Sequence, residues 1–258
     1  MTDALARMVG AAGAADADVV LHADCIAKSL GGRRVLSAAT LRAPAGRVTA
    51  LLGRMGTGKS TLLRICAGVL AADAGWVAFG GRRQPRPRHA ALAAAGLFYL
   101  ADARNLLDAP SVREQYAFVA RRFPAGSLDR ATELLCLHEL LDRRPPSLSG
   151  GERRRAELGL AMLRAPRCLL ADEPFRGIDP LAAELVGRAL RALARDGCAV
   201  VATGHEVPAL VPWVDDVVWV TAGTTHALGP PATAWRDDAF RREYLGPGLA
   251  AAGVPERG

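Results

Sequence analysis

One run of consecutive residues in this chain has the types and spacing of a phosphate-binding loop. Residues 53–60 read Gly-Arg-Met-Gly-Thr-Gly-Lys-Ser, which matches the pattern G-x-x-x-x-G-K-[ST]. The glycines let backbone N–H groups close around phosphate oxygens, and the positive end of a helix expected from Ser60 adds to the attraction. Lys59 is expected to reach the β- and γ-phosphates, and the Ser60 hydroxyl to reach Mg²⁺. The predicted nucleotide-binding residues are Gly53, Arg54, Met55, Gly56, Thr57, Gly58, Lys59, Ser60 and Thr61.

Lysine is rare in this chain, and one lysine falls in that loop. Lysine and arginine together number 33, of which only Lys28 and Lys59 are lysines. An ammonium group fits among phosphate oxygens as a compact point charge, whereas the guanidinium fork of arginine is broader. The presence of lysine at position 59 therefore supports a phosphate-binding role for it.

Two further groups of polar residues follow apolar runs that are typical of strands. Asp172 and Glu173 come directly after residues 168–171, and His205 follows residues 199–203. Carboxylate oxygens suit the hard Mg²⁺ ion, and successive strand side chains alternate, so the two carboxylates are expected to face different ways. His205 stands just past a strand, at the edge where such sheets bind ligands. As alternatives, Glu173 could cap a helix or form an ion pair, and a lone histidine is often structural.

Strand and helix patterns alternate along the chain. Strands are expected at 19–27, 47–52, 76–79, 96–100, 168–172, 199–203 and 217–220, with a turn at Gly31–Gly32. Helices are expected from Ser60 and at 111–141, 152–164, 180–195 and 208–214. This alternation predicts an α/β fold with a mostly parallel sheet. Residues 103–150 are expected to form a helical insert.

Another motif stands between the phosphate loop and the carboxylates. It reads Leu148-Ser149-Gly150-Gly151-Glu152, and we call it the signature segment. With this segment in that position, the chain resembles the ATP-binding-cassette ATPases, the nucleotide-driven motors of ABC transporters. The resemblance runs from about Val19 to about Gly246 and implies a P-loop NTPase fold with a small antiparallel N-terminal β part. It divides the chain into a disordered tail (1–18), an ATPase domain (19–246) and a C-terminal tail (247–258).

The resemblance implies a role for each polar residue near the ends of the predicted strands. Asp172 would hold Mg²⁺, usually through water, and Glu173 would be the catalytic glutamate that polarises the attacking water. His205 resembles the switch histidine that contacts the γ-phosphate. Asp179 matches the loop that crosses to the partner subunit, and aspartate is also a good helix cap.

In this family the signature segment does not serve the nucleotide of its own chain. Ser149, Gly150 and Gly151 would bind the nucleotide held by the other subunit, so catalysis requires a head-to-tail dimer, either homomeric or heteromeric. A serine hydroxyl, glycine amides and a helix N-terminus make a second anion-binding surface. The implied ligands are ATP and Mg²⁺, and the implied partners are a second ATPase subunit and transmembrane permease subunits.

Two residues depart from the family pattern. The family usually places an aromatic residue upstream of the phosphate loop to stack on adenine, and Leu30 stands there. Stacking is worth about 1–3 kcal/mol per base on nucleic-acid platforms, so discrimination between ATP and GTP is expected to be weak. The family also places a glutamine before the helical insert, where aligning residues 96–100 puts Asp102. Its carboxylate could still serve Mg²⁺, with a shorter reach that would change coupling to a membrane subunit.

Composition limits the classes of partner. The net charge is +7 and the isoelectric point is about 9.7, but the arginines are scattered and aromatic residues make up only 5%, so nucleic-acid binding is not expected. The tightest basic cluster, residues 82–89, reads as a solvated loop.

The cysteines lack C-x-x-C spacing, which suggests neither zinc nor disulfides and fits a reducing cytosol. Cys66 and Cys168 are expected in the core. No apolar window is long enough to span a membrane.

These observations predict the ATP-binding subunit of an ABC transporter, cytoplasmic and peripheral on the inner face of the membrane, which hydrolyses MgATP to drive a separate permease. Residues 240–246 resemble the tail of ATPases for branched-chain amino-acid uptake and lipopolysaccharide export, but this segment is too short to name a substrate. Two alternatives stay open: a soluble ABC ATPase with an assembly or scaffold role, and a weakly hydrolysing regulatory subunit. The intact catalytic motifs count against a regulatory subunit. The departures from the family pattern at Leu30 and Asp102 keep that alternative open.

Overall fold

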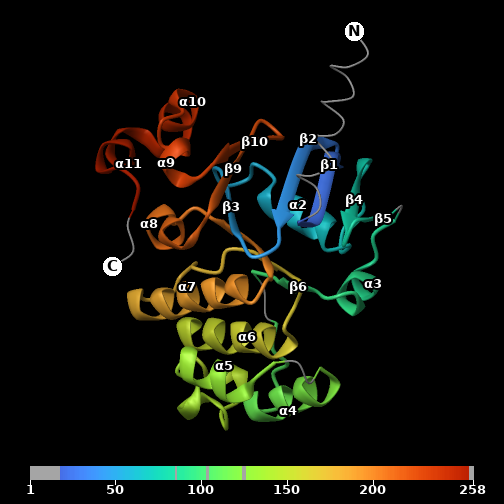
Figure 1. The fold of residues 1–258 in the computed structure, drawn as a ribbon, viewed down its shortest axis with the longest axis vertical. Coiled ribbons are helices and arrows are strands. Elements are labelled where there is room, and N and C mark those ends of the chain that lie inside the picture. The colour runs from blue at the N-terminus through green and yellow to red at the C-terminus, as the bar shows by residue number, and fades with distance from the viewer. Residues whose placement is uncertain (1–17, 85, 103–104, 124–125, 256–258) are drawn as a thin grey trace.

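The computed structural model describes residues 18–84, 86–102, 105–123 and 126–255. The strands form one sheet in the order β5-β4-β1-β2-β10-β9-β3-β8-β7-β6. Figure 1 shows the sheet in the upper part of the molecule, α4, α5 and α6 gathered below it, and α7 between them. The predicted tail 1–18 lies outside the described residues except for its last residue.

The parallel part of the sheet carries the phosphate loop. β3 (Val48–Leu52), β6 (Leu97–Leu100), β7 (Cys168–Ala171) and β8 (Ala199–Gly204) run parallel, and β9 (Asp216–Thr221) is parallel to β3. Every residue of β3, β7 and β8 is buried, which explains their nearly continuous apolar sequences. Because parallel strands end at the same edge, the residues that follow β3, β7 and β8 are brought together.

The N-terminal part of the sheet is antiparallel, as the family resemblance implied. β1 (Val19–Leu30) pairs with β2 (Arg33–Pro44) and β4 (Ala74–Phe79), and β4 pairs with β5 (Arg82–Gln84). β10 (Thr224–Gly229) pairs antiparallel with β9 and connects to β2. The sequence patterns did not predict β2 or β10, and they assigned β5 to a loop. Register shifts between β1 and β2 disturb the alternation of buried residues, and no residue of β10 is buried, so both strands lack a clean period-2 pattern.

The predicted helices stand close to their expected positions, with one interruption, and several short helices were not predicted. α2 (Lys59–Cys66) follows the phosphate loop, α6 (Gly150–Arg164) begins in the signature segment, and α7 (Pro180–Arg195) follows the two carboxylates. The helix expected at 111–141 is divided into α4 (Val112–Arg122) and α5 (Leu128–Leu134), because the residue before Pro124 is pushed out of helical geometry. The shorter helices are α3 (His89–Ala94), α8 (Val207–Leu210), α9 (Pro231–Ala234), α10 (Asp238–Phe240) and α11 (Gly246–Ala252).

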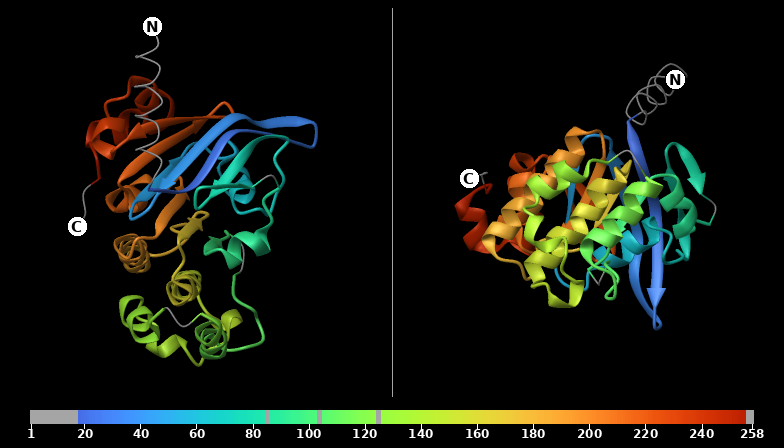
Figure 2. Two further views of the ribbon diagram at one scale, coloured as in Figure 1. Left: turned by 45° about the vertical axis from the view of Figure 1, so that its right-hand side comes forward. Right: turned by 90° about the horizontal axis from the view of Figure 1, so that it is seen from below.

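The sheet separates two hydrophobic clusters. On β3, Val48, Ala50 and Leu52 belong to the cluster under α4, α6 and α7, whereas Leu51 belongs to the cluster under α2, as strand alternation requires. Seen from below, the helices between residues 112 and 195 lie side by side (Figure 2). Cys66 and Cys168 are buried in the core as predicted. The segment assigned to a C-terminal tail contains most of α11, and Leu249, Ala250 and Val254 pack against the first cluster.

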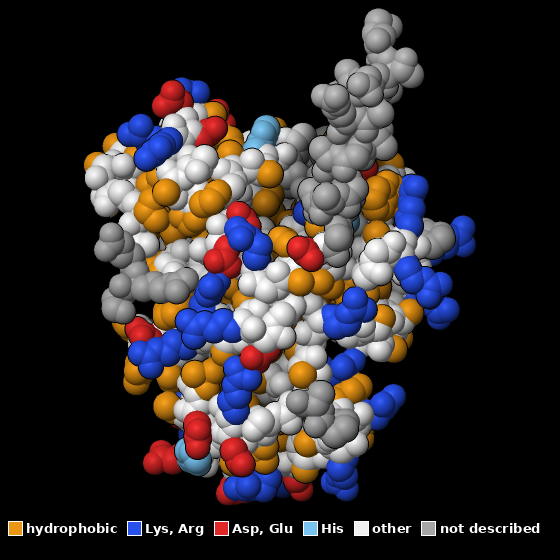
Figure 3. Space-filling view, in the orientation of Figure 1, with side chains coloured by type: hydrophobic (Ala, Val, Ile, Leu, Met, Phe, Trp, Pro, Cys, Tyr) orange, Lys and Arg blue, Asp and Glu red, His pale blue; other side chains and the backbone are white. Residues whose placement is uncertain are grey.

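The structure bears on two further features considered in the sequence: membrane-spanning segments and the distribution of basic side chains. None of the helices in the described ranges is long and apolar enough to cross a membrane. On the face shown in Figure 3, Lys and Arg side chains occupy several separate regions with Asp and Glu between them. This view agrees with the scattering of arginines seen in the sequence.

Candidate active site

The phosphate loop lies between β3 and α2, as the sequence predicted. Gly56 and Gly58 have φ angles of 79° and 102°, in the left-handed region that favours glycine. A Cβ atom at Gly58 would lie 2.6 Å from Cδ2 of Leu36 on β2. Position 58 therefore requires glycine for its conformation and also for space.

Lys59 is buried at the base of this loop. Its Nζ donates to the carbonyl oxygens of Gly53 (2.8 Å) and Arg54 (3.1 Å) and lies 3.9 Å from Oε1 of Glu173. Burial lowers the pKa of Lys59, and the negative charges of Glu173 and Asp172 oppose that shift. Since charged acceptors bind an ammonium group more strongly than carbonyls do, phosphate oxygens can displace its present partners.

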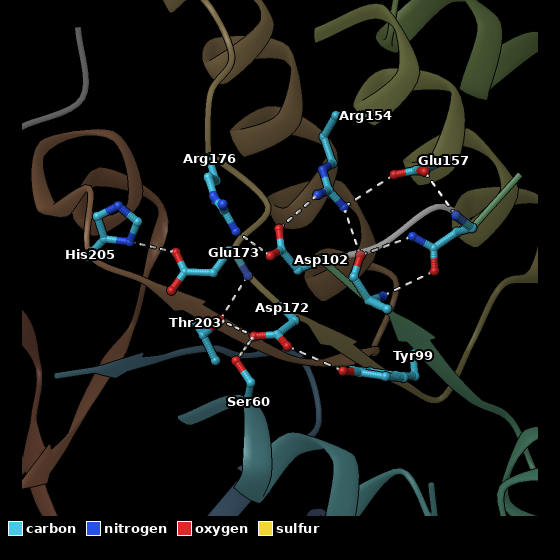
Figure 4. A network of polar contacts seen from close by, with 12 residues as sticks. Ser60, Tyr99, Asp102, Arg154, Glu157, Asp172, Glu173, Arg176, Thr203 and His205 are labelled. Atoms are coloured by element: carbon cyan, nitrogen blue, oxygen red, sulfur yellow. Dashed lines mark hydrogen bonds and ion pairs between the residues drawn. The ribbon is translucent and has the colours of Figure 1, made fainter. Parts of the chain in front are cut away.

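Asp172 is completely buried and is held by three hydroxyl groups (Figure 4). Its Oδ1 accepts hydrogen bonds from Ser60 Oγ and Thr203 Oγ1, both at 2.9 Å, and its Oδ2 accepts from Tyr99 Oη at 3.3 Å. Burial, together with the charge of Asp172, raises the pKa of Tyr99 to about 12. The tyrosine therefore keeps its proton and acts as a donor to the carboxylate.

Glu173 points away from Asp172 (Figure 4), but β7 ends at Ala171, so strand alternation does not set this direction. Its backbone N–H donates to Oγ1 of Thr203 (2.8 Å), and its Oε2 lies 3.0 Å from Nδ1 of His205. Its φ angle of 51° is a left-handed conformation that costs on the order of 1–3 kcal/mol for a residue other than glycine. The hydrogen bond to Thr203 stabilises this conformation, which turns the carboxylate toward Lys59 and His205.

The phosphate loop and the catalytic candidates share one pocket of about 320 Å³. It is lined by Leu30, Val35, Met55, Gly56, Gly58, Lys59, Ser60, Thr61, Asp102, Glu173, Arg176 and His205. The pocket opens at the carboxyl edge of the parallel strands, where such sheets bind ligands. Leu30, which the resemblance assigned to the base-stacking position, lines this pocket together with phosphate-loop residues and is 42% exposed.

The signature segment, in contrast, does not line that pocket in the described part of the chain. The Oγ of Ser149 accepts a hydrogen bond from the N–H of Glu152 (3.3 Å), and the Glu152 carboxylate accepts one from the N–H of Ser149 (2.8 Å), which caps α6. Gly150 is exposed and lines a second pocket. Asp179 caps α7 by accepting from the N–H of Ala182 (2.9 Å). One chain thus brings neither Ser149 nor Asp179 to its own phosphate pocket.

Asp102 is paired with arginines in this structure. Its Oδ2 accepts a hydrogen bond from Arg176, and its Oδ1 lies 3.9 Å from a guanidinium nitrogen of Arg154. Its carboxylate lines the phosphate pocket without contacting Ser60 or Asp172. The role of Asp102 at Mg²⁺ therefore stays a prediction, and the arginines are the partners that the structure gives it.

Three polar residues of the site were not singled out from the sequence: Tyr99, Thr203 and Arg176. Tyr99 and Thr203 are polar residues near the carboxyl ends of β6 and β8. A polar residue at the end of an otherwise apolar parallel strand is the signal that could have found them. Arg176 lies in the short segment between Glu173 and Asp179, and no spacing rule pointed to it.

Comparison with known proteins agrees with this geometry. The sequence profile of the family described as ABC transporter matches residues 36–176. The chain belongs to the ABC transporter family. It is 34% identical over 241 residues to a probable ABC transporter ATP-binding protein of Azorhizobium caulinodans, covering 90% of this chain and 85% of that one. It is 32% identical over 234 residues to the lipopolysaccharide export system ATP-binding protein LptB of Escherichia coli K12, covering 88% of this chain and 97% of LptB.

Solved structures share the fold. A nucleotide-free ATP-binding cassette from an ABC transporter matches with a TM-score of 0.74 and 22% identity, covering 90% of this chain and 97% of that chain. The dimeric structure of MJ0796, a bacterial ABC transporter cassette, matches with a TM-score of 0.70 and 20% identity, covering 81% and 98%. The predicted P-loop NTPase fold and the assignment to the ATP-binding-cassette ATPases, which hydrolyse ATP, are confirmed.

Thr203→Val tests whether one hydroxyl holds both carboxylates. The substitution keeps the shape of the side chain, but Asp172 loses a donor and the N–H of Glu173 loses its acceptor. Since removing such an orienting partner typically costs about 10–100-fold, we expect kcat for ATP hydrolysis to fall by roughly that factor, with little change in ATP affinity. Phosphate release measured at saturating ATP gives the rate.

Thr49→Val on the adjacent strand β3 is the matched control for Thr203→Val. The Thr49 hydroxyl is buried and has no hydrogen-bond partner among the described residues, so its removal should leave the rate unchanged. If the two valine variants hydrolyse ATP equally fast, Thr203 does not orient the catalytic groups.

Proposed function

We propose that this chain is the ATP-binding subunit of an ABC transporter, which hydrolyses MgATP in a head-to-tail dimer to drive a separate membrane permease. The observation that carries the proposal is the meeting of Lys59, Glu173 and His205 with the phosphate loop around one pocket. Phosphoryl transfer requires cations that stabilise the developing charge and a residue that orients the attacking water. The names of the relatives, all transporter ATP-binding proteins, favour this function over the scaffold and regulatory alternatives.

Ser60 and Asp172 have the chemistry to hold Mg²⁺ beside the phosphates. Both offer oxygen atoms at the end of the phosphate loop, 2.9 Å apart, and oxygen is the ligand that Mg²⁺ prefers. Mg²⁺ commonly takes only one or two protein ligands and completes its shell with water and substrate phosphates. Among the described residues, no group of three or more His, Cys, Asp or Glu side chains could hold a metal ion. When bound, Mg²⁺ neutralises charge on the β- and γ-phosphates.

Three side chains then have defined tasks at the reacting centre. Lys59 exchanges the carbonyls of Gly53 and Arg54 for phosphate oxygens. Glu173 accepts a hydrogen bond from the attacking water and so orients it. His205 keeps Nδ1 toward Glu173, at 3.0 Å, which leaves Nε2 to face the γ-phosphate.

The site is completed by a second subunit. Ser149 and Gly150 are exposed at the N-terminus of α6, outside the phosphate pocket of their own chain. The backbone amides of a helix N-terminus attract anions. A second copy or a homologous subunit, turned head to tail, would place this surface against the γ-phosphate held by the first.

Glu173→Gln tests the proposed hydrolytic function. Glutamine keeps the size of the side chain but is a far weaker base, so hydrolysis should fall roughly 10²–10⁴-fold while ATP binding persists. Phosphate release and equilibrium binding of ATP, measured on the same preparation, give both quantities. Wild-type turnover by the variant would show that another residue positions the water.

An apolar groove on the helical insert offers a docking surface for the permease. It has a volume of about 430 Å³ and is lined by Asn105, Leu107, Pro110, Glu114, Gln115, Phe118, Val119 and Leu160. Leu107 and Phe118 are 70% and 71% exposed, and exposed apolar patches of this kind mark interaction sites. A cytoplasmic helix of the permease would bury them in the helix-in-groove manner and hold the chain at the inner face of the membrane.

Hydrogen bonds and ion pairs connect this groove to Asp102, which lines the phosphate pocket. The backbone N–H of Asn105 donates to Oε1 of Glu157 (3.0 Å), and the other oxygen of Glu157 lies 3.2 Å from Arg154. Arg154 in turn donates to the carbonyl of Ala101 (3.2 Å) and lies beside Asp102. A partner seated in the groove would therefore press on the segment that carries Asp102 into the phosphate pocket.

Phe118→Ser tests the groove. The substitution removes an exposed aromatic ring and should reduce the amount of chain recovered with washed membranes of the cells that natively make it. Leu181→Ser is the matched control, because Leu181 is 70% exposed on α7, outside the groove. Equal recovery of the two variants with membranes would contradict docking at this groove.

A further inference from the structure

Arg176 is the member of the phosphate pocket that the family motifs leave unexplained. It follows Glu173 in the loop after β7, and its guanidinium group donates to Oδ2 of Asp102 at the end of β6 (Figure 4). Both partners line the phosphate pocket. The ion pair therefore joins the segment after β6 to the segment after the neighbouring strand β7, at the wall of the pocket.

Arg176 supplies positive charge to the phosphate pocket. Among the described residues that line this pocket, Lys59 and Arg176 are the lysine and arginine side chains, and Asp102 and Glu173 are the carboxylates. Arg176 also lines the neighbouring pocket with Arg153 and Arg154, where Asp102 and Glu157 supply the negative charges and Arg154 pairs with Glu157 at 3.2 Å. A planar guanidinium can bind two phosphate oxygens at once, which an ammonium group cannot.

Asp102 holds Arg176 only weakly. The two side chains are 34% and 59% exposed, and exposed ion pairs contribute little because water screens both charges and the side chains lose freedom. A terminal phosphate carries more negative charge than one carboxylate and would lie in the pocket that Arg176 already lines. The phosphate should therefore compete successfully for the guanidinium group.

We propose that Arg176 exchanges Asp102 for the γ-phosphate of ATP bound by the same chain, and that this exchange gives the chain a preference for ATP over ADP. The inference rests on the proposed ATP-binding function. Asp102 acts as a holding anion that keeps Arg176 at the pocket wall until ATP arrives. ADP lacks the γ-phosphate and leaves the Asp102–Arg176 pair in place.

The test compares the affinities of two nucleotides at protein concentrations too low for dimers. The probes are ADP and the β,γ-imido analogue of ATP, which is not hydrolysed. Arg176→Ala should weaken binding of the ATP analogue about tenfold, as the loss of a charged hydrogen bond predicts. The affinity for ADP should be unchanged. Asp102→Asn should tighten binding of the ATP analogue about two- to fivefold, because the carboxylate no longer competes with the γ-phosphate for the Arg176 guanidinium group.

The exchange predicts that Arg176→Ala weakens binding of the ATP analogue and that Asp102→Asn strengthens it, which a purely structural role of the pair does not. If the pair merely braces the loop, both variants weaken the ATP analogue, and the proposal is overturned. Asp102→Asn also removes a negative charge near the phosphates, so the double variant is needed. Asp102→Asn should have almost no effect in the Arg176→Ala background, and equal tightening in both backgrounds would mean simple charge repulsion and overturn the exchange.

Two further variants complete the design. Arg188→Ala is the matched control, since Arg188 is 57% exposed and pairs with Glu184 at 2.7 Å on α7, and it should bind both nucleotides like the wild type. Arg176→Lys keeps the charge without the fork and should weaken the ATP analogue less than Arg176→Ala does. A wild-type chain that binds neither nucleotide would overturn the proposed function itself. A wild-type chain that prefers the ATP analogue, with the preference unchanged in a folded Arg176→Ala, would overturn only the role of Arg176.

Discussion

The two hydrogen bonds that Oδ1 of Asp172 accepts, from Ser60 and from Thr203, tie together the ends of three neighbouring strands. Ser60 follows β3, Asp172 follows β7 and Thr203 lies on β8, which stands between them in the sheet. A completely buried carboxylate is costly unless its oxygens are hydrogen-bonded, so the strand ends and the carboxylate stabilise one another. The same contacts hold Ser60 and Asp172 together, which is the arrangement that the proposed Mg²⁺ site needs, and they connect through Thr203 to the backbone N–H of Glu173.

A close contact within the chain keeps the signature segment apart from the phosphate pocket. The N-terminus of α6 packs against the loop before α7, where a Cβ atom at Gly151 would lie 3.0 Å from Oδ2 of Asp179. This close approach fixes the signature segment away from the phosphate pocket of its own chain. In the proposed head-to-tail dimer, the exposed N-terminus of α6 on each copy would face the phosphate pocket of the other.

Most of the site could be read from contiguous sequence, because each motif adjoins a buried parallel strand with a distinct apolar run. The positions of Thr203 and Tyr99 near the ends of apolar strands could have marked them as site residues, but their partners could not be read, since both are common strand formers and their contacts depend on which strands are neighbours. Arg176 and Asp102 are 74 residues apart in the sequence, and no local sequence pattern predicts an ion pair between residues so far apart. In the fold, β2 and β10 escaped prediction for a related reason: their pairing is irregular or exposed and leaves little alternation in the sequence.

The central claim is that each active site combines Lys59 of one chain with Ser149 of another. The most direct test measures the ATP affinity of Ser149→Arg and Lys59→Ala at protein concentrations too low for dimers to form. We predict that Ser149→Arg binds ATP like the wild type but fails to dimerise when ATP is added, because the bulky side chain blocks the interface, whereas Lys59→Ala weakens binding by the monomer. If Ser149→Arg weakens ATP binding as much as Lys59→Ala does, the signature segment serves the nucleotide of its own chain and the dimer mechanism is wrong.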